Sequence, residues 1–482
     1  MKQPKEKAHK VLGPLLIAVF VVVIILPLLI YGYVYPTAGD DSAQHLLVID
    51  AVSKGEAVNF LYWGQAIVAY PIRFLSKWTE VSTDNLFLWF NYLALIAVGI
   101  TFYFVLSRLV NRWAGLLAVP ITIFCTHSIL RQFYFGTIFN IINMYVILPL
   151  AIFFAIRWFT EYRLYQALVS LLLFVTFSVF HTTALYLLPF IASFFVVIVV
   201  YKLLKRDRTK LVKTACFGAC VIGLSLVLVR LLPYSQTLTT QATTRAAGVV
   251  TTTPTIASVP TAIAPTSSAV TLGNFLSYGL GPTTLVILCL SIAALIMYRK
   301  KLMLTRSSKL FIVALACFAI VLLPASFTQL SDYAYRQALD LSSILAIATA
   351  CLAGVAMTVD KTKLFTSIVI VLVICGSIPH LISWFGYTSA VRPADMQAIE
   401  YVNSLNGDSY SCSDTIKPAI YDRWLEKTYV AEDGDYVLYR SELMTARAYA
   451  TPCTDKLEDY NGLQLMKKFE DGEIEVYVFK NH

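Results

Sequence analysis

An acidic tripeptide followed by a histidine is the pattern in this chain with the clearest potential for chemistry. Gly39-Asp40-Asp41 comes directly after the first long apolar run, and His45 lies four positions after Asp41. The i, i+4 spacing puts Asp41 and His45 on one face of a helix. They could share a divalent cation such as Mg²⁺ or Mn²⁺, or divide general-base catalysis and phosphate binding between them. Asp40 alone could simply cap the helix start, but acidic groups at a membrane boundary usually bind or catalyse.

Histidines and arginines near the predicted outer ends of apolar runs form a second group. We expect substrate contacts from His127, Arg131, His181 and Arg336. Guanidinium groups bind phosphate in a bidentate manner and stay charged at a membrane boundary. Arg131 and Arg336 also lie in very short outer loops, against the general distribution of basic residues. The alternatives are snorkelling of the arginines to lipid headgroups and a turn-capping role for His181.

The composition is that of a polytopic membrane protein. Of the 482 residues, 58% are hydrophobic and 14% are charged, and the mean hydropathy is +0.69. These values exceed what a soluble core requires. About eleven apolar runs are long enough to cross a bilayer, for which a full span takes about 20 residues. They lie near residues 11–34, 86–106, 113–126, 138–156, 164–180, 184–204, 214–232, 285–297, 310–323, 339–357 and 364–385.

Basic residues predict the orientation of these spans. Lys and Arg accumulate in short cytoplasmic loops, and with a cytoplasmic N-terminus every predicted inner loop is basic. A first outer loop at 36–84, a long outer loop at 235–282 and the C-terminus then lie outside. We therefore expect a multi-pass plasma-membrane protein. The net charge of +9 follows mainly from this topology, so it does not indicate nucleic-acid binding.

The first outer loop is predicted to rest on the membrane. A helix is expected over residues 41–54, ended by Gly55, and the aromatic stretch 60–78 is typical of a segment that lies in the interface. The long outer loop is rich in Thr, Ala, Ser, Val and Pro and shows no sustained period, which favours an irregular segment. It could be a lid over substrate or a permissive insertion.

We expect residues 1–390 to form the membrane domain and residues 391–482 a small extracytoplasmic α/β domain. Pro393 opens a short helix that reaches Asn403, and alternating stretches at 435–440 and 473–479 predict strands. This domain could recognise the acceptor or serve as a structural cap. It also holds a pair of cysteines, Cys412 and Cys453, which an oxidising compartment would allow to form a disulfide.

The pattern resembles that of the GT-C glycosyltransferases, polytopic enzymes that use lipid-phosphate-linked sugars and include protein O-mannosyltransferases, the lipid A aminoarabinose transferase and the catalytic subunit of oligosaccharyltransferase. The specific part is the motif that opens the first outer loop, Gly39-Asp40-Asp41-Ser42-Ala43-Gln44-His45. The rest is architecture: an inside N-terminus, interfacial helices, many spans and an outer C-terminal domain. The resemblance is closest to the large bacterial branch of the class.

The resemblance implies an inverting transfer of a hexose from a polyprenyl-phosphate donor to a glycan, lipid or protein acceptor. In that role Asp41 would be the base toward the acceptor, with Asp40 as the alternate. The motif has Asp-Asp where several members have Asp-Glu, and the Trp-Trp-Asp tract of oligosaccharyltransferase is missing, so protein N-glycosylation is not expected. The sequence also has no Walker A, no GxGxxG after a strand and no GxSxG elbow, which disfavours nucleotide-driven chemistry.

A transporter or flippase of lipid-linked saccharides is the competing hypothesis, and a noncatalytic receptor built around the C-terminal domain is a third. Transporters usually hold ionisable groups near the bilayer midplane and show paired repeats with broken helices. In this chain the singled-out charges lie at the outer rim and no repeat is evident. These features favour the enzyme.

Overall fold

The computed structural model describes most of the chain. The described residues are 5–31, 40–56, 58, 60, 62–126, 128–134, 136–204, 208–230, 275, 280–298, 305–327, 334–360, 363–385, 393–413, 416, 421, 424–430, 434–441, 456–472 and 474–481. The predicted long outer loop, residues 235–282, falls almost wholly outside these ranges, so the lid and the insertion both stay predictions.

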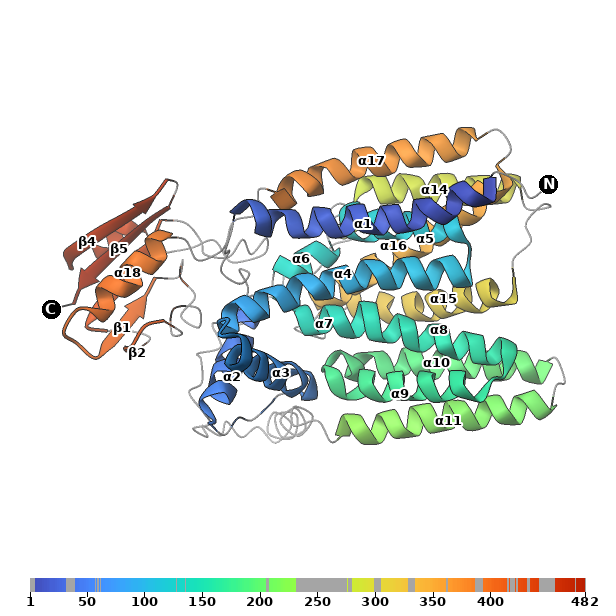
Figure 1. The fold of residues 1–482 in the computed structure, drawn as a ribbon, viewed down its shortest axis with the longest axis horizontal. Coiled ribbons are helices and arrows are strands. Elements are labelled where there is room, and N and C mark those ends of the chain that lie inside the picture. The colour runs from blue at the N-terminus through green and yellow to red at the C-terminus, as the bar shows by residue number, and fades with distance from the viewer. Residues whose placement is uncertain are drawn as a thin grey trace.

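Helices make up nearly all of the described residues as far as residue 403, and most run side by side along the length of the molecule (Figure 1). They are α1 (Lys5–Tyr31), α2 (Asp40–Lys54), α3 (Trp63–Thr79), α4 (Thr83–Leu109), α5 (Arg112–Phe124), α6 (Ser128–Tyr134), α7 (Ile138–Ile142), the π-helical turn η1 (Asn143–Ile147), α8 (Leu148–Glu161), α9 (Leu164–Phe180), α10 (Thr183–Leu204), α11 (Arg208–Arg230), α14 (Pro282–Met297), α15 (Arg306–Phe327), α16 (Ala334–Val359), α17 (Leu364–Phe385) and α18 (Pro393–Asn403).

Within the described residues, six helical stretches are long and apolar enough to cross a membrane. They are Thr83–Leu109, Ile138–Glu161, Leu187–Leu204, Lys210–Arg230, Ala338–Val359 and Leu364–Ile382. Shorter apolar helices accompany them at Leu12–Pro27, Arg112–Phe124, Leu164–Phe180 and Pro282–Met297. A mostly helical fold with apolar helices of membrane-spanning length is thus confirmed, while the number of spans, about eleven, stays a prediction.

The centre of the bundle is built on a close crossing of α5 and α16. A Cβ atom added to Gly354 of α16 would collide with the backbone of Ala114 in α5. Small residues let helix backbones approach in this way inside membranes. The start of α5 is fixed by Asn111, whose side chain accepts a hydrogen bond of 2.9 Å from the Ala114 N–H. α5 and α16 both pack against α6 at one end of their crossing.

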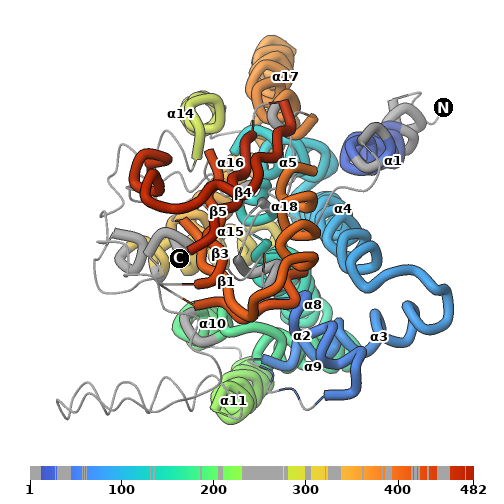
Figure 2. Tube along the Cα trace, turned by 90° about the vertical axis from the view of Figure 1, so that its left-hand side faces the viewer, coloured from blue at the N-terminus to red at the C-terminus, as the bar shows by residue number. Residues whose placement is uncertain are grey.

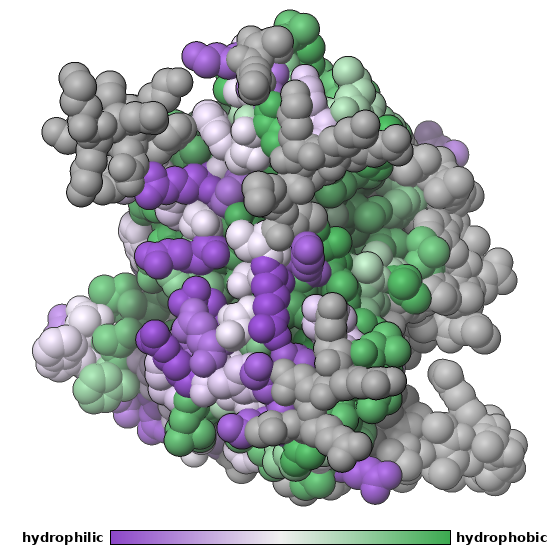
Figure 3. All heavy atoms as spheres, turned by 90° about the vertical axis from the view of Figure 1, so that its right-hand side faces the viewer, coloured by the Kyte–Doolittle hydropathy of each residue, from purple (hydrophilic) through white to green (hydrophobic). Residues whose placement is uncertain are grey.

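The outer helices turn apolar side chains away from the bundle. Only 17% of the apolar window of α17 is buried, and Ile374 and Ile382 are more than half exposed. Large apolar surfaces of this kind mark contact with a membrane or a partner. Figure 3 shows that hydrophilic side chains gather instead at the end of the bundle where α4 and α8 finish. Described basic residues at these helix ends are Arg108, Arg112, Arg157, Arg163 and Lys210.

α2 and α3 lie at the opposite end of the bundle (Figures 1 and 2). α2 ends at Lys54 and Gly55 follows with φ +82°, which confirms the predicted helix and its stop. One side of α3 packs inward, whereas the other presents a row of half to three-quarters exposed apolar side chains. The row consists of Trp63, Ile67, Tyr70, Phe74 and Trp78. Such a helix is suited to the predicted interfacial position.

The C-terminal residues form a five-stranded sheet beyond this same end of the bundle (Figure 1). The strands are β1 (Ser409–Cys412), β2 (Thr428–Tyr429), β3 (Tyr436–Arg440), β4 (Gln464–Asp471) and β5 (Ile474–Lys480), in the order β2-β1-β3-β5-β4. β1 pairs in parallel with β2 and β3, while β5 pairs antiparallel with β3 and β4. α18 shares an apolar core with this sheet, so the predicted helix and both predicted strands are confirmed.

A buried ion pair attaches α18 to β3. Nε of Arg440 lies 3.2 Å from Oδ1 of Asp395, and the Tyr421 hydroxyl donates a hydrogen bond of 2.6 Å to the same oxygen. Removing one partner of a buried pair is strongly destabilising. The predicted partner of Cys412, Cys453, lies outside the described residues, and the disulfide stays a prediction.

Candidate active site

The acidic motif forms the start of α2. Asp40 and Asp41 occupy its first turn, and His45 follows one turn later. The helix packs against α3 and α4 at the end of the bundle nearest the sheet. The side chains of the two aspartates lie outside what the structure describes, so which of them is the base stays a prediction. His45 is described and shows what this face of α2 meets.

His45 is buried in a pocket of aromatic and polar side chains. Its Nε2 lies 3.3 Å from the Tyr62 hydroxyl, and the Gln65 amide donates a long hydrogen bond of 3.4 Å to Nδ1. The ring of Phe139 meets the imidazole edge-on with a centroid distance of 4.4 Å. Because Nδ1 accepts, this arrangement fits a neutral imidazole whose Nε2–H points to Tyr62.

His181 lies on the other side of Tyr62. The two rings are 4.6 Å apart between centroids and meet edge-on. Nδ1 of His181 accepts a hydrogen bond of 3.2 Å from the Thr183 N–H and lies 3.0 Å from the Thr183 hydroxyl. That hydroxyl in turn accepts a hydrogen bond of 3.0 Å from the Asn143 amide. His181 therefore presents a neutral ring with the proton on Nε2.

A glycine allows α3 to reach this position. A Cβ atom on Gly64 would collide with the carbonyl oxygen of Phe180, the residue just before His181, and would crowd the ring of Phe139. Tyr62 lies two residues before this glycine, and Gln65 follows it directly. The close approach at Gly64 thus brings the start of α3 between the two histidines.

The described residues do not favour a metal at His45. Both ring nitrogens face protein groups, so a cation would have to displace the Tyr62 or the Gln65 contact. In the part of the chain that the structure describes, no group of three or more His, Cys, Asp or Glu could hold a metal ion. A shared site of Asp41 and His45 stays a prediction, and no step proposed below passes through a metal.

The two predicted arginines lie on adjacent helices. Arg131 belongs to α6 and Arg336 to the first turn of α16. Of these two residues the structure describes the backbone and not the side chains. The helices are joined by Ser128, whose hydroxyl donates to the Leu339 carbonyl at 2.5 Å and lies 2.5 Å from the Ser343 hydroxyl. His127 falls outside the described residues.

The very short outer loop predicted to hold Arg131 is instead partly helical. Ser128–Tyr134 form α6 because Ile129, Leu130 and Phe133 give the segment an apolar face, and all three are buried. Gly136, with φ +73°, makes the sharp connection to α7.

Sequence reasoning missed Tyr62, Asn143 and Asp340. Tyr62 and Asn143 carry no pattern that separates them from other core residues. Asp340 does carry one, since it is the single carboxylate inside the predicted apolar runs, and ionisable groups within membrane segments are usually functional. It is completely buried in α16.

No protein-family model and no curated protein matches the chain. Solved structures do match its fold. The Archaeoglobus fulgidus oligosaccharyltransferase in its apo form aligns over 88% of this chain and 64% of its own, with a TM-score of 0.59 at 10% identity. The same enzyme tethered to an acceptor peptide containing the NVT sequon aligns over 87% and 64%, with a TM-score of 0.56 at 10% identity.

A bacterial structure is similar over an even larger share of this chain. The mycobacterial arabinofuranosyltransferase AftD covers 98% of it and 40% of its own length, with a TM-score of 0.50 at 11% identity. The present chain thus spans less than two thirds of either enzyme. Both are GT-C membrane glycosyltransferases, and at these identities the likeness establishes a shared fold. The expectation of a fold shared with these membrane glycosyltransferases is therefore confirmed.

Proposed function

We propose that the chain is an integral membrane glycosyltransferase. It would move a hexose from a polyprenyl-phosphate-linked donor to a hydroxyl group of a cell-envelope acceptor, on the outer face of the plasma membrane. The observation that carries this proposal is the placement of the Asp40-Asp41 turn beside His45, Tyr62 and His181 at one end of a GT-C-like bundle. Structural neighbours named for an acceptor peptide and for arabinofuranosyl transfer support the reaction type.

Asp41 is the proposed general base, with Asp40 as the alternate. Its carboxylate accepts the proton of the acceptor hydroxyl as that oxygen attacks the anomeric carbon of the donor. The new carbon–oxygen bond forms on one face of the sugar while the bond to the phosphate oxygen breaks on the other, so the configuration inverts. A positioned base of this kind contributes about 10²–10⁴-fold to a rate.

The leaving group is polyprenyl phosphate, which departs with the bonding electrons and gains negative charge. Arg131 and Arg336, on the adjoining ends of α6 and α16, would bind this phosphate. His45, His127 and His181 are the proposed histidine contacts to the sugar and phosphate, and His45 would exchange its Tyr62 contact for substrate in order to donate. Losing one such donor typically costs about 10²–10³-fold in rate. Apolar grooves between helices would hold the isoprenoid tail.

The proposal includes the division of the chain into two domains and the orientation of the chain in the membrane. Residues 1–390 would carry the reaction and residues 391–482 would lie outside the cell, above the same end of the bundle as α2. Basic residues at the helix ends on the other side of the bundle, such as Arg108, Arg112 and Arg157, support a cytoplasmic N-terminus. Membrane lipids and a glycan, lipid or protein acceptor are the proposed partners.

One observation favours the competing transporter. Asp340 is a carboxyl group buried inside a membrane-spanning helix, and such groups often couple ion movement to transport. The fold match to glycosyltransferases argues for the enzyme. Proton-driven uptake of a lipid-linked saccharide by reconstituted vesicles would decide for the transporter.

The test uses the purified chain in proteoliposomes with envelope membranes from a host that lacks the gene. Undecaprenyl phosphate carrying tritiated mannose, glucose or galactose is supplied, and transfer to the envelope fraction is counted. We expect Asp41→Asn to lower the rate by about 10²-fold or more. Asp50→Asn is the matched control, because Asp50 lies on the same helix and instead accepts a hydrogen bond from Thr83.

Retained transfer in both Asp41→Asn and Asp40→Asn would remove the proposed base. Absence of transfer from all three donors by wild-type protein would count against hexosyl transfer itself. Equal losses in Asp41→Asn and Asp50→Asn would reduce the acidic motif to a structural role.

A further inference from the structure

A second buried polar network surrounds Asp340, away from the histidines. The Tyr145 hydroxyl donates a hydrogen bond of 2.9 Å to Oδ1 of Asp340, and the Gln132 amide donates one of 3.1 Å to the same oxygen. The Gln132 amide also lies 2.8 Å from the Tyr145 oxygen, which closes a triangle. The Asn140 amide donates to Oε1 of Gln132 at 2.7 Å. All four side chains are at most 2% exposed.

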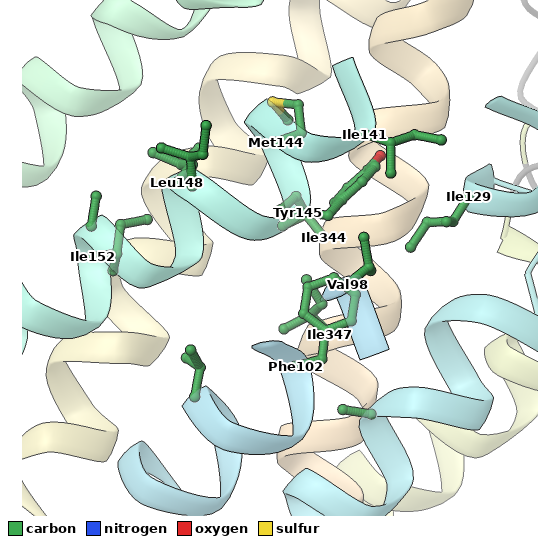
Figure 4. Close-up of a cluster of buried hydrophobic side chains, with 14 of the residues drawn as sticks. Val98, Phe102, Ile129, Ile141, Met144, Tyr145, Leu148, Ile152, Ile344 and Ile347 are labelled. Carbon is green, nitrogen blue, oxygen red and sulfur yellow. The ribbon is translucent and has the colours of Figure 1, made fainter. Parts of the chain in front are cut away.

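These residues come from four elements that meet at the candidate site's end of the bundle. Gln132 follows Arg131 in α6, Asn140 is in α7, Tyr145 is in η1, and Asp340 lies one turn after Arg336 in α16. Figure 4 shows Tyr145 projecting from η1 among Ile129, Ile141 and Ile344. In such apolar surroundings the paired groups of a polar network favour one arrangement of the helices, and breaking the network is costly. Within the described residues, Oδ1 of Asn140 is buried without a hydrogen-bond partner.

The π-helical turn gives this network its geometry. Asn140 and Tyr145 are five positions apart, which in an α-helix would separate them by about 140° around the axis. Asn140 lies in α7, and the wider i, i+5 turn of η1 that follows it reduces this separation. Both side chains can therefore reach Gln132. Relaxation of η1 to an α-helix would rotate Tyr145 away from Asp340.

The opposite face of the same segment serves the histidines. Phe139 packs on His45, and the Asn143 amide donates hydrogen bonds to the Thr183 hydroxyl and, at 3.2 Å, to the Phe177 carbonyl. Within the described residues Oδ1 of Asn143 has no hydrogen-bond partner, which costs about 1–3 kcal/mol for a buried group. An apolar side chain would avoid that cost, so the position of Asn143 favours a role for its amide donor.

We propose that Asp340 is a positioning residue of the candidate active site. Through Tyr145 it holds the π-helical turn that aims Asn143 at Thr183, and Thr183 in turn fixes the ring of His181. The functional meaning of this assignment rests on the proposed glycosyl transfer, but the coupling from Asp340 to His181 can be measured without any substrate. Asp340 also holds α6 and α16 together beside Arg131 and Arg336.

The experiment measures the tautomer of His181 by nitrogen-15 NMR. Full-length protein labelled at histidine is placed in lipid nanodiscs, and the His181 signals among those of the six histidines are assigned by their loss in His181→Gln. Wild-type protein should show one unprotonated Nδ1 and one protonated Nε2. Asp340→Leu and Tyr145→Phe should both split the Nδ1 signal into two populations.

Two variants separate positioning from general stability. Asp340→Asn keeps an acceptor oxygen for Tyr145 and should retain the single wild-type signal. Asp360→Leu removes a carboxyl group at the other end of α16, which accepts hydrogen bonds from the Thr366 N–H and hydroxyl, and should leave His181 unchanged. Unchanged His181 signals in folded Asp340→Leu and Tyr145→Phe would overturn the proposal.

An equal response in Asp360→Leu would also overturn it, because any loss of a buried carboxyl group would then have the same effect. The NMR result does not depend on sugar transfer. A coupled His181 in a protein without transferase activity would refute the proposed function alone, whereas an active enzyme with an uncoupled His181 would refute the positioning role alone.

Discussion

Tyr62 connects the two histidines that the sequence singles out. Its hydroxyl faces His45 and its ring edge faces His181, so one side chain holds two elements far apart in the sequence. Its burial against aromatic rings leaves few alternative positions for the hydroxyl. The side chain thus orders the pair of histidines.

Tyr62→Phe should lower sugar transfer about fivefold, because a buried neutral hydrogen bond is worth about 1 kcal/mol and the ring packing remains. The rate is measured with the tritiated undecaprenyl-phosphate donors, and retained folding is checked by thermal unfolding. Tyr70→Phe is the matched control, since Tyr70 lies on the same helix and is 53% exposed. A wild-type rate for Tyr62→Phe would show that the hydroxyl has no part in the reaction.

Single residues could be predicted where their chemistry is unusual for their position. His45 and His181 stand out as ionisable groups beside apolar runs, and the structure places them next to one shared tyrosine. Tyr62 could not be found, because an aromatic residue in an aromatic-rich loop has many possible partners. Asn143 is likewise an ordinary polar residue until Thr183 is seen opposite it.

Element boundaries could be predicted where a residue with a strong local preference begins or ends a helix. Gly55 ends α2 and Pro393 opens α18 as expected. β3 and β5 could be predicted from their apolar residues, but β4 has exposed positions on both faces and therefore lacks a clear alternation. The π-helical turn has no sequence signature, because tertiary contacts of Tyr145 and Asn143 decide its geometry.

Asp435 ties the start of β1 to the start of β3. Its Oδ2 accepts hydrogen bonds of 2.9 Å from the Ser409 hydroxyl and from the backbone N–H groups of Asp408 and Ser409. The Ser409 hydroxyl, followed by these backbone donors, holds the pKa of the Asp435 carboxyl below its ordinary value. Because the pKa of this carboxyl is lower in the folded state, its charged form stabilises the strand junction at pH values above the ordinary pKa. The stabilisation is lost as the pH falls through the lowered pKa.

Local opening of this junction should therefore increase as the pH falls below about 4. The measurement is hydrogen exchange at the Asp408 and Ser409 amides in the full-length protein, corrected for the intrinsic pH dependence of exchange. Asp435→Asn should exchange faster above that pH and lose the dependence, whereas Asp471→Asn, at the β4–β5 turn, should keep it. Exchange in wild-type protein that does not respond to pH would rule out the role of the Asp435 carboxylate.

At the scale of the whole molecule, the basic helix ends and the candidate active site lie at opposite ends of the bundle. Hydrophilic side chains gather at one end (Figure 3), where Arg108, Arg157 and Arg163 lie at helix ends, and the other end carries α2, α3 and the sheet (Figure 1). The sequence predicts this separation because the inner loops are basic. How the far ends of helices converge depends on contacts such as Gly64 with Phe180, which no linear pattern records.

The orientation of the bundle decides which compartment supplies the acceptor, and it can be tested directly. In a variant whose nine cysteines are replaced, single cysteines are introduced as Lys54→Cys, at the exposed end of α2, and Arg163→Cys, at the basic end. Arg163 has a side-chain exposure of 65%, so a label could reach either position. Because basic loops stay in the cytoplasm, a membrane-impermeant maleimide should label Lys54→Cys in intact cells and Arg163→Cys only after permeabilisation. The reverse pattern would place the acidic motif inside the cell, where an envelope acceptor could not reach Asp41, and the proposed reaction would fail with it.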